Sequence, residues 1–169
     1  MARGILLMGA LLVTGGALAT PTVIFDGTAY DLAQVTAGAT DVSNRYSPVN
    51  ADAAGQPALT VREFPGATST ADVIARCTSA LKGYLLDAPL ALERSEHGDD
   101  VVLLMYRKTA EAHLVEYILE RFVRTPTGVR SYRFTQRIHA DADLRPVLMR
   151  QPGRIAELFG LNLPVRQAM

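Results

Sequence analysis

The sequence has a single cysteine, no excess of charge of either sign and no apolar run long enough to cross a membrane. Cys77 is the only thiol among 169 residues, so an intramolecular disulfide is excluded even in a compartment that permits one. Basic and acidic residues number 17 each. This balance lacks the basic character typical of proteins that bind nucleic acids or anionic membranes. We therefore expect no nucleic-acid partner.

Residues 1–19 carry the features of a secretory signal peptide. Arg3 supplies a positive charge, and an apolar run of ten residues follows it, although a membrane span needs roughly 20. Ala17 and Ala19 form the small-x-small pattern that signal peptidase recognises, so we place the cleavage before Thr20. The alternatives are a buried N-terminal helix and an uncleaved anchor. We expect an exported bacterial protein, periplasmic or secreted, with no stable membrane anchor after cleavage.

Residues 20–169 have the size of a single domain that buries a core without metal or disulfide. Apolar residues at helical spacing predict one main helix at about residues 70–85, begun by a cap at Ser69. Short helices are predicted near the C-terminus, before and after Pro152. Alternating patterns and turn residues predict strands at residues 23–25, 29–34, 58–64, 90–96, 101–107, 114–124 and 129–139.

This order of elements predicts an α+β domain. The antiparallel sheet contains a four-strand meander at residues 90–139 plus the N-terminal strands, and the helices pack on one face. Residues 50–56 are polar and small, which is typical of a loop.

The segment 114–124 also fits a helical stripe, but its charges favour a strand. In a hairpin that places Arg124 opposite Val129, Glu116 faces Arg137 and Glu120 faces Arg133. Cross-strand pairs of opposite charge are favourable, whereas a helix would stack Glu116 over Glu120. We therefore predict the hairpin, with both charge pairs formed.

The charged face of this hairpin is the candidate binding site. Arginine can bind a carboxylate or phosphate through its fork of N–H donors. The alternative is a sheet face that neutralises itself, since each acid has a basic partner. The predicted binding residues are Glu116, Glu120, Arg133 and Arg137, with Arg121 and Arg130 nearby.

Two histidines form a candidate metal site. The same hairpin register brings His113 beside His139, with Asp141 just beyond, and two imidazoles with a carboxylate suit zinc or copper. Solvated residues at the end of a strand are the alternative. Cys77 lies on the apolar stripe of the predicted helix, so we expect a packed structural thiol and not a nucleophile.

No local motif indicates a reaction. The sequence contains no Gly-x-Ser-x-Gly elbow, no glycine-rich phosphate loop and no His-Glu-x-x-His helix. We predict a non-enzymatic binding or interaction protein without a cofactor, whose partner is another envelope or secreted protein. The alternative is an exported hydrolase, a metal-dependent enzyme or a metal carrier that uses His113, His139 and nearby acids.

Overall fold

The computed structural model of the chain describes residues 22–49, 56–111 and 113–166. The predicted signal peptide and most of the loop predicted at residues 50–56 lie outside these ranges. Within them, no helix has the length and apolar character needed to span a membrane. The elements are β1 (Val23–Phe25), β2 (Thr28–Ala37), β3 (Val42–Pro48), β4 (Ala58–Pro65), α1 (Thr70–Leu81), β5 (Leu90–Arg94), β6 (Asp100–Lys108), β7 (Leu114–Thr125), β8 (Gly128–His139), α2 (Arg145–Met149) and α3 (Gln151–Gly160).

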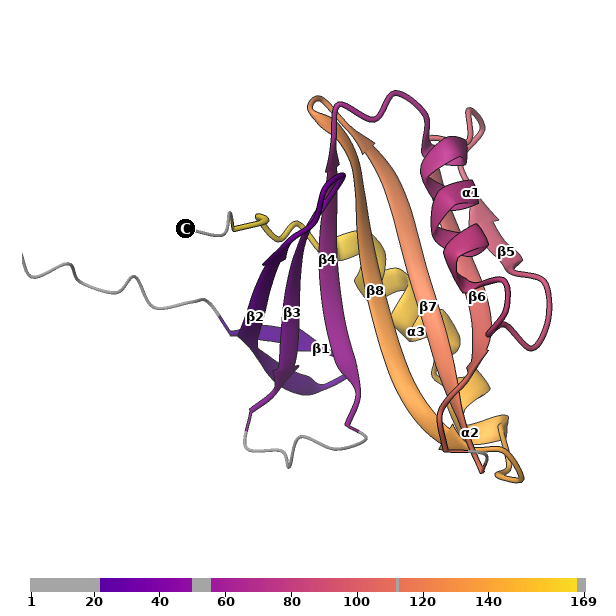
Figure 1. Cartoon of the computed structure of the whole chain (residues 1–169). Helices are drawn as coiled ribbons and strands as arrows, with labels where there is room; N and C mark the ends of the chain where they lie inside the picture. The colour runs from indigo at the N-terminus through magenta and orange to yellow at the C-terminus, as the bar shows by residue number, and fades with distance from the viewer. Residues whose placement is uncertain (1–21, 50–55, 112, 167–169) are drawn as a thin grey trace, which may run out of the picture.

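The described strands form one antiparallel sheet in the order β1-β2-β3-β4-β8-β7-β6-β5. Strands β1 to β4 follow one another across one half of the sheet, and β5 to β8 across the other (Figure 1). The halves join where β4 pairs with β8, from Ala58 opposite Thr135 to Pro65 opposite Gly128. The broad prediction of an α+β domain built on an antiparallel sheet is confirmed.

Two hairpins follow from local sequence. Asp26 and Gly27 connect β1 to β2 with φ angles of 49° and 71°, which is the left-handed backbone that a tight Asp-Gly hairpin turn requires. In the second hairpin, Glu120 of β7 pairs with Arg133 of β8, and Arg124 pairs with Val129. The predicted strand at residues 114–124 and its register are therefore confirmed.

The helices cover both faces of the sheet. On β7, Ile118 and Phe122 pack in one apolar cluster with residues of α1. Tyr117 and Leu119 alternate with them and pack in a second cluster with residues of α3. Figure 1 accordingly shows α1 in front of the sheet and α3 behind it.

The prediction that all helices pack on one face is therefore wrong. The physical reason lies in β6, where every residue from Val101 to Met105 is buried. Such a strand needs apolar cover on both sides. The expectation of one main helix is also inaccurate, because α1 has 12 residues and α3 has 10.

Helix α1 begins as predicted and ends early. The Ser69 Oγ accepts a hydrogen bond from the Asp72 backbone N–H at 3.2 Å, which caps the first turn. The helix ends at Leu81, four residues before the predicted end. Leu85 instead forms a β-bridge with Arg107 at the end of β6, so the chain after α1 joins the sheet.

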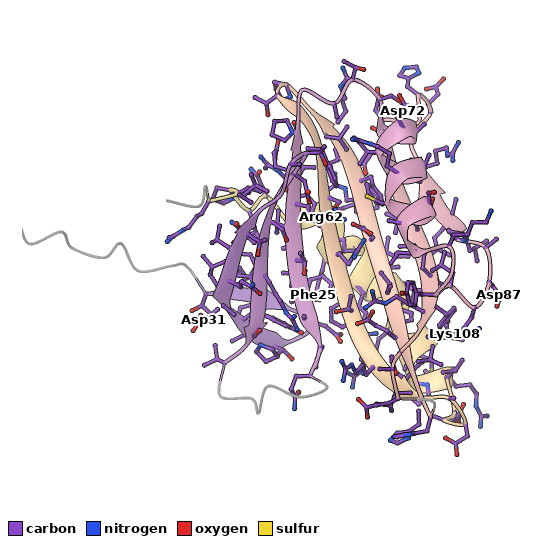
Figure 2. All side chains as sticks on the ribbon, viewed as in Figure 1. Phe25, Asp31, Arg62, Asp72, Asp87 and Lys108 are labelled. Atoms are coloured by element: carbon purple, nitrogen blue, oxygen red, sulfur yellow. The ribbon has the colours of Figure 1, made fainter. Side chains whose placement is uncertain are left out.

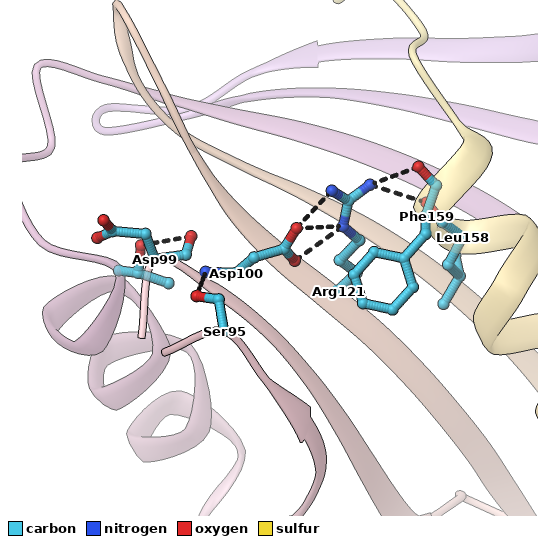
Figure 3. Close-up of polar contacts among 7 residues, drawn as sticks. Ser95, Asp99, Asp100, Arg121, Leu158 and Phe159 are labelled. Carbon is cyan, nitrogen blue, oxygen red and sulfur yellow. Dashed lines mark hydrogen bonds and ion pairs between the residues drawn. The ribbon is translucent and has the colours of Figure 1, made fainter. Parts of the chain in front are cut away.

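Arg121 of β7 holds the C-terminus of α3 against the sheet (Figure 3). Its Nε and Nη2 atoms donate to the carboxylate of Asp100 at 2.9 and 2.6 Å. Its Nη1 donates to the carbonyl oxygens of Leu158 and Phe159 at 3.1 Å each. These carbonyls lie in the last turn of the helix, where the helix dipole favours a cation, and the Leu158 carbonyl also accepts the Leu161 N–H at 3.3 Å.

A second arginine ties α3 to the β1–β2 turn. Arg154 is only 2% exposed, and its Nε and Nη2 donate to Asp26 Oδ2 at 3.0 and 2.7 Å. Its Nη2 also donates to Gln136 Oε1 at 3.0 Å, and its guanidinium lies 4.6 Å from the centre of the Phe134 ring. This contact joins the first hairpin of the sheet to α3.

Candidate functional site

The four predicted binding residues share the face of the sheet that α1 covers. Glu116 and Glu120 lie two residues before and after Ile118, which packs beneath α1, so they share its face; Arg137 and Arg133 lie directly opposite them on β8. Arg121 lies on the other face, where it contacts α3. Arg130 donates to the carbonyl of Leu163 in the C-terminal segment. The expectation that Arg121 and Arg130 belong to the same charged surface is wrong.

Glu120 and Arg133 form the predicted cross-strand pair, but they form it inside the protein. Glu120 is 0% exposed, and Arg133 Nε and Nη2 lie 2.9 and 2.7 Å from Glu120 Oε2. Burial opposes the charge on Arg133, but the Glu120 carboxylate outweighs this effect and raises the pKa of the guanidinium above its usual value. Both contacts go to Oε2, and Glu120 Oε1 is buried without a hydrogen-bond partner among the described residues. Because each charge has the other as its partner, we infer a structural role for the pair.

The predicted ion pair between Glu116 and Arg137 is not formed. Their backbones are opposite each other as expected, but the Glu116 carboxylate pairs with Arg107 of β6. Arg137 Nη1 lies instead 3.2 Å from Glu111 Oε1. The cause is the position of β7 between β6 and β8, which gives Glu116 a basic neighbour on each side.

Arg107, Glu116 and Arg137 line a cavity of about 360 Å³ at the C-terminal end of α1. We call this cavity the basic pocket, because three of the residues that line it are basic and only one is acidic. It is lined by Ala80, Leu81, Tyr84, Arg107, Lys108, Thr109, Ala110, Glu116 and Arg137.

Two of the cations in the basic pocket are accessible to a ligand. Lys108, labelled in Figure 2, is exposed and forms no ion pair with any described residue. Arg137 is 40% exposed and Glu111, its partner, is 51% exposed. Ion pairs at this exposure contribute little to stability, so an incoming anion can replace Glu111. Arg107 is already held by the half-buried Glu116.

Hydrogen bonds to the main chain fix the shape of the basic pocket. The backbone N–H of Lys108 donates to the carbonyl of Tyr84 at 2.8 Å, which places the segment after α1 beside the end of β6. Thr109 Oγ1 donates to the carbonyl of Glu111 at 2.8 Å and accepts from the Glu111 N–H at 3.1 Å. Lys108 and Tyr84 were not among the binding residues predicted from the sequence. Two adjacent basic residues, Arg107 and Lys108, at the end of a predicted strand could have indicated an anion-binding site. The position of the end of α1 beside them could not be predicted from the sequence.

The two predicted metal-binding histidines lie side by side. The rings of His113 and His139 are stacked, with their centres 5.6 Å apart, and His113 Nε2 is 3.9 Å from Glu111 Oε2. Asp141 does not join them: among the described residues, no three His, Cys, Asp or Glu side chains are grouped closely enough to hold a metal ion. The metal site stays a prediction.

Cys77 occupies the packed position that its helical spacing predicts. It is 9% exposed and belongs to the cluster beneath α1. Arg62 Nη1 donates to its Sγ at 3.6 Å. Burial, followed by the charge of Glu120, raises the pKa of the thiol, so the reactive thiolate is disfavoured.

Comparison of the sequence and the structure with known proteins found no similar family or protein. No protein-family model, no curated protein and no solved structure matches the chain. A fold alone does not determine a function. The function of this chain is therefore argued from the basic pocket and the residues around it.

Proposed function

We propose that the chain is exported, loses residues 1–19 and acts as a non-enzymatic binding protein in the periplasm or outside the cell. It binds an acidic group of another envelope or secreted protein in the basic pocket. The observation that supports this proposal most strongly is the presence of two available cations, Lys108 and Arg137, around one cavity of about 360 Å³. No cofactor is required for this role.

The chemistry of the basic pocket favours a carboxylate. The guanidinium of Arg137 can bind both oxygens of a carboxylate, and the ammonium of Lys108 adds a point charge. The aromatic ring of Tyr84 lines the same cavity and is 61% exposed, and tyrosine is among the residues that contribute most to protein interfaces. Because loss of residues 1–19 removes Arg3 and leaves 16 basic and 17 acidic residues, attraction to an acidic partner is local to this pocket and gives specificity.

Affinity capture from the native envelope fraction tests this proposal. The bait is the purified protein, compared with the double variant Lys108→Ala/Arg137→Ala and with the control Arg76→Ala. Arg76 is an exposed cation on α1 that lines no described pocket. We expect one partner to be retained by the wild type and the control and lost by the double variant. Equal capture by all three proteins would contradict the proposal.

The histidine pair supports a second candidate, a metal carrier or metal-dependent enzyme. The stacking of His113 on His139 brings two imidazoles together, and imidazole is a common ligand of zinc and copper. The binding proposal expects His113→Ala/His139→Ala to leave capture of the partner and thermal stability almost unchanged. Stoichiometric zinc or copper in the purified protein, lost in this double variant, would favour the metal candidate.

A further inference from the structure

A second cavity lies at the same end of the sheet as the basic pocket. It has a volume of about 270 Å³, and we call it the apolar pocket. Asp87 and His139 are the only polar residues that line it, and both are exposed. It has no lining residue in common with the basic pocket.

Strands β6, β7 and β8 each contribute to both cavities. Neighbouring residues line different cavities: Arg107, Glu116 and Arg137 line the basic pocket, and Tyr106, Val115 and Ile138 line the apolar pocket. Successive side chains of a strand point to opposite faces. Tyr106, Val115 and Ile138 accordingly pack in the cluster on the α3 side, so the apolar pocket lies on the face of the sheet opposite the basic pocket.

The other walls of the apolar pocket come from segments that flank these strands. The backbone N–H of Leu86 donates to the carbonyl of Tyr106 at 2.9 Å, which places the segment after α1 at the edge of the cavity. Leu144, the residue before α2, also lines the cavity. No residue of α2 is buried, so little burial opposes a small shift of this wall when a ligand enters.

The lining of the apolar pocket suits an uncharged molecule. Ile138 is 9% exposed, and Tyr106, Val115 and Leu144 are half-buried. A charged group placed against these side chains would leave water without a buried partner of opposite charge, which is costly.

The size of the cavity and the side chain of Tyr106 favour an aromatic ligand. An apolar cavity of about 150 Å³ can bind benzene, so about 270 Å³ has room for one or two rings. The ring of Tyr106 meets that of Tyr117 edge-to-face, with 6.0 Å between the ring centres, and this contact fixes its orientation. A fixed aromatic ring in the wall can stack on a ring of the ligand or meet it edge-on.

We infer that the apolar pocket binds a small, uncharged aromatic molecule of one or two rings. Small-molecule sites are typically concave and mostly apolar, with a few polar groups. The apolar pocket has this composition, with Asp87 and His139 as its polar residues. This inference does not depend on the proposed function, because the two cavities have no residue in common.

Nuclear magnetic resonance titration with indole tests the inference, and indole-3-carboxylate serves as the charged comparison. The proteins are the wild type, Leu86→Ser, Val115→Thr and the control Leu90→Ser. Leu86 is 44% exposed and Leu90 is 57% exposed, so neither serine should unfold the protein. Leu90 is on the same edge of the sheet but lines neither cavity. Val115→Thr adds a hydroxyl to the wall with little change in volume.

We expect indole to bind with a dissociation constant below about 1 mM and to shift the amide signals of Leu86, Val115 and Ile138. Leu86→Ser and Val115→Thr should each weaken binding by about fivefold, because each removes apolar contact with the ligand. Leu90→Ser should leave binding unchanged. Indole-3-carboxylate should bind this cavity at least about tenfold more weakly than indole, because its charge would be buried without a partner.

The inference would be overturned if indole gave no saturable shifts at these amides, or if its affinity were unchanged in either lining variant. Equal binding of indole-3-carboxylate at the same amides would contradict the selection of an uncharged ligand. A dimer of the wild type that Leu86→Ser dissociates would show that a second copy of the chain fills the cavity, and would also overturn the inference. None of these results bears on the proposed function, which depends on the basic pocket.

Discussion

Removal of Arg133 alone should destabilise the fold far more than a surface charge pair would. The substitution Arg133→Met leaves the carboxylate of Glu120 at 0% exposure without its cation. Breaking a buried ion pair from one side costs about 3–5 kcal/mol. A cross-strand pair judged from sequence alone would be worth at most about 1 kcal/mol. Total stabilities are about 5–15 kcal/mol, so the effect is large enough to measure accurately.

The double variant Glu120→Leu/Arg133→Met removes both charges and should recover most of this loss. Replacing a buried ion pair with apolar side chains of similar volume is often neutral or stabilising. The coupling free energy of the cycle should therefore reach about 2 kcal/mol or more, measured by denaturant unfolding of the four proteins. The exposed pair Asp143 and Arg145 provides the control cycle, for which we expect little coupling. Additive effects of Glu120→Leu and Arg133→Met would show that the two side chains do not stabilise each other.

Three further predictions concern the thiol, the tyrosines and the N-terminus. Cys77 should react slowly with a thiol reagent until denaturant is added, because burial raises its pKa and blocks access; rapid labelling of the native protein would show that α1 does not cover it. Burial also raises the pKa of Tyr30 and Tyr117 to about 12, above the usual 10.0. The folded state then holds protons that the unfolded state releases, so stability should fall as the pH rises from about 10 towards 12. Phenolate absorbance should show that Tyr30 and Tyr117 ionise at a higher pH than the exposed tyrosines. Ionisation of all the tyrosines over the same pH range would contradict the burial of these two side chains. Mass spectrometry of the exported protein should find Thr20 as its first residue, and recovery of an intact Met1 form would count against cleavage.

The features that sequence predicted well are set by neighbouring strands or by a few adjacent residues. Asp26-Gly27 defines a hairpin because few other residues adopt its left-handed backbone. The register of β7 on β8 could be predicted because one alignment satisfies Glu120 with Arg133 and also pairs Leu119 with Phe134. Each of these inferences needs only the two strands that it joins.

The features that sequence could not provide depend on distant parts of the chain. The partner of Glu116 is Arg107, because β6 lies on the far side of β7 from β8. The faces covered by α1 and α3 depend on how the two halves of the sheet join at β4 and β8. The basic pocket forms because α1 ends at Leu81 and returns the chain to β6. Helical periodicity alone predicts a helix that continues past Leu81 and includes Tyr84. It therefore gives no indication that Tyr84 lies beside Lys108.

Nuclear magnetic resonance titration with a small dicarboxylate, glutarate, tests whether the basic pocket binds an acidic group without any knowledge of the partner. We expect saturable shifts of the Lys108 and Thr109 amide signals and of the Arg137 side-chain N–H. These shifts should weaken with added salt, persist in Arg76→Ala and disappear in Lys108→Ala/Arg137→Ala. If glutarate does not shift the signals of these groups, or if the shifts persist in the double variant, the pocket does not bind an acidic group as proposed.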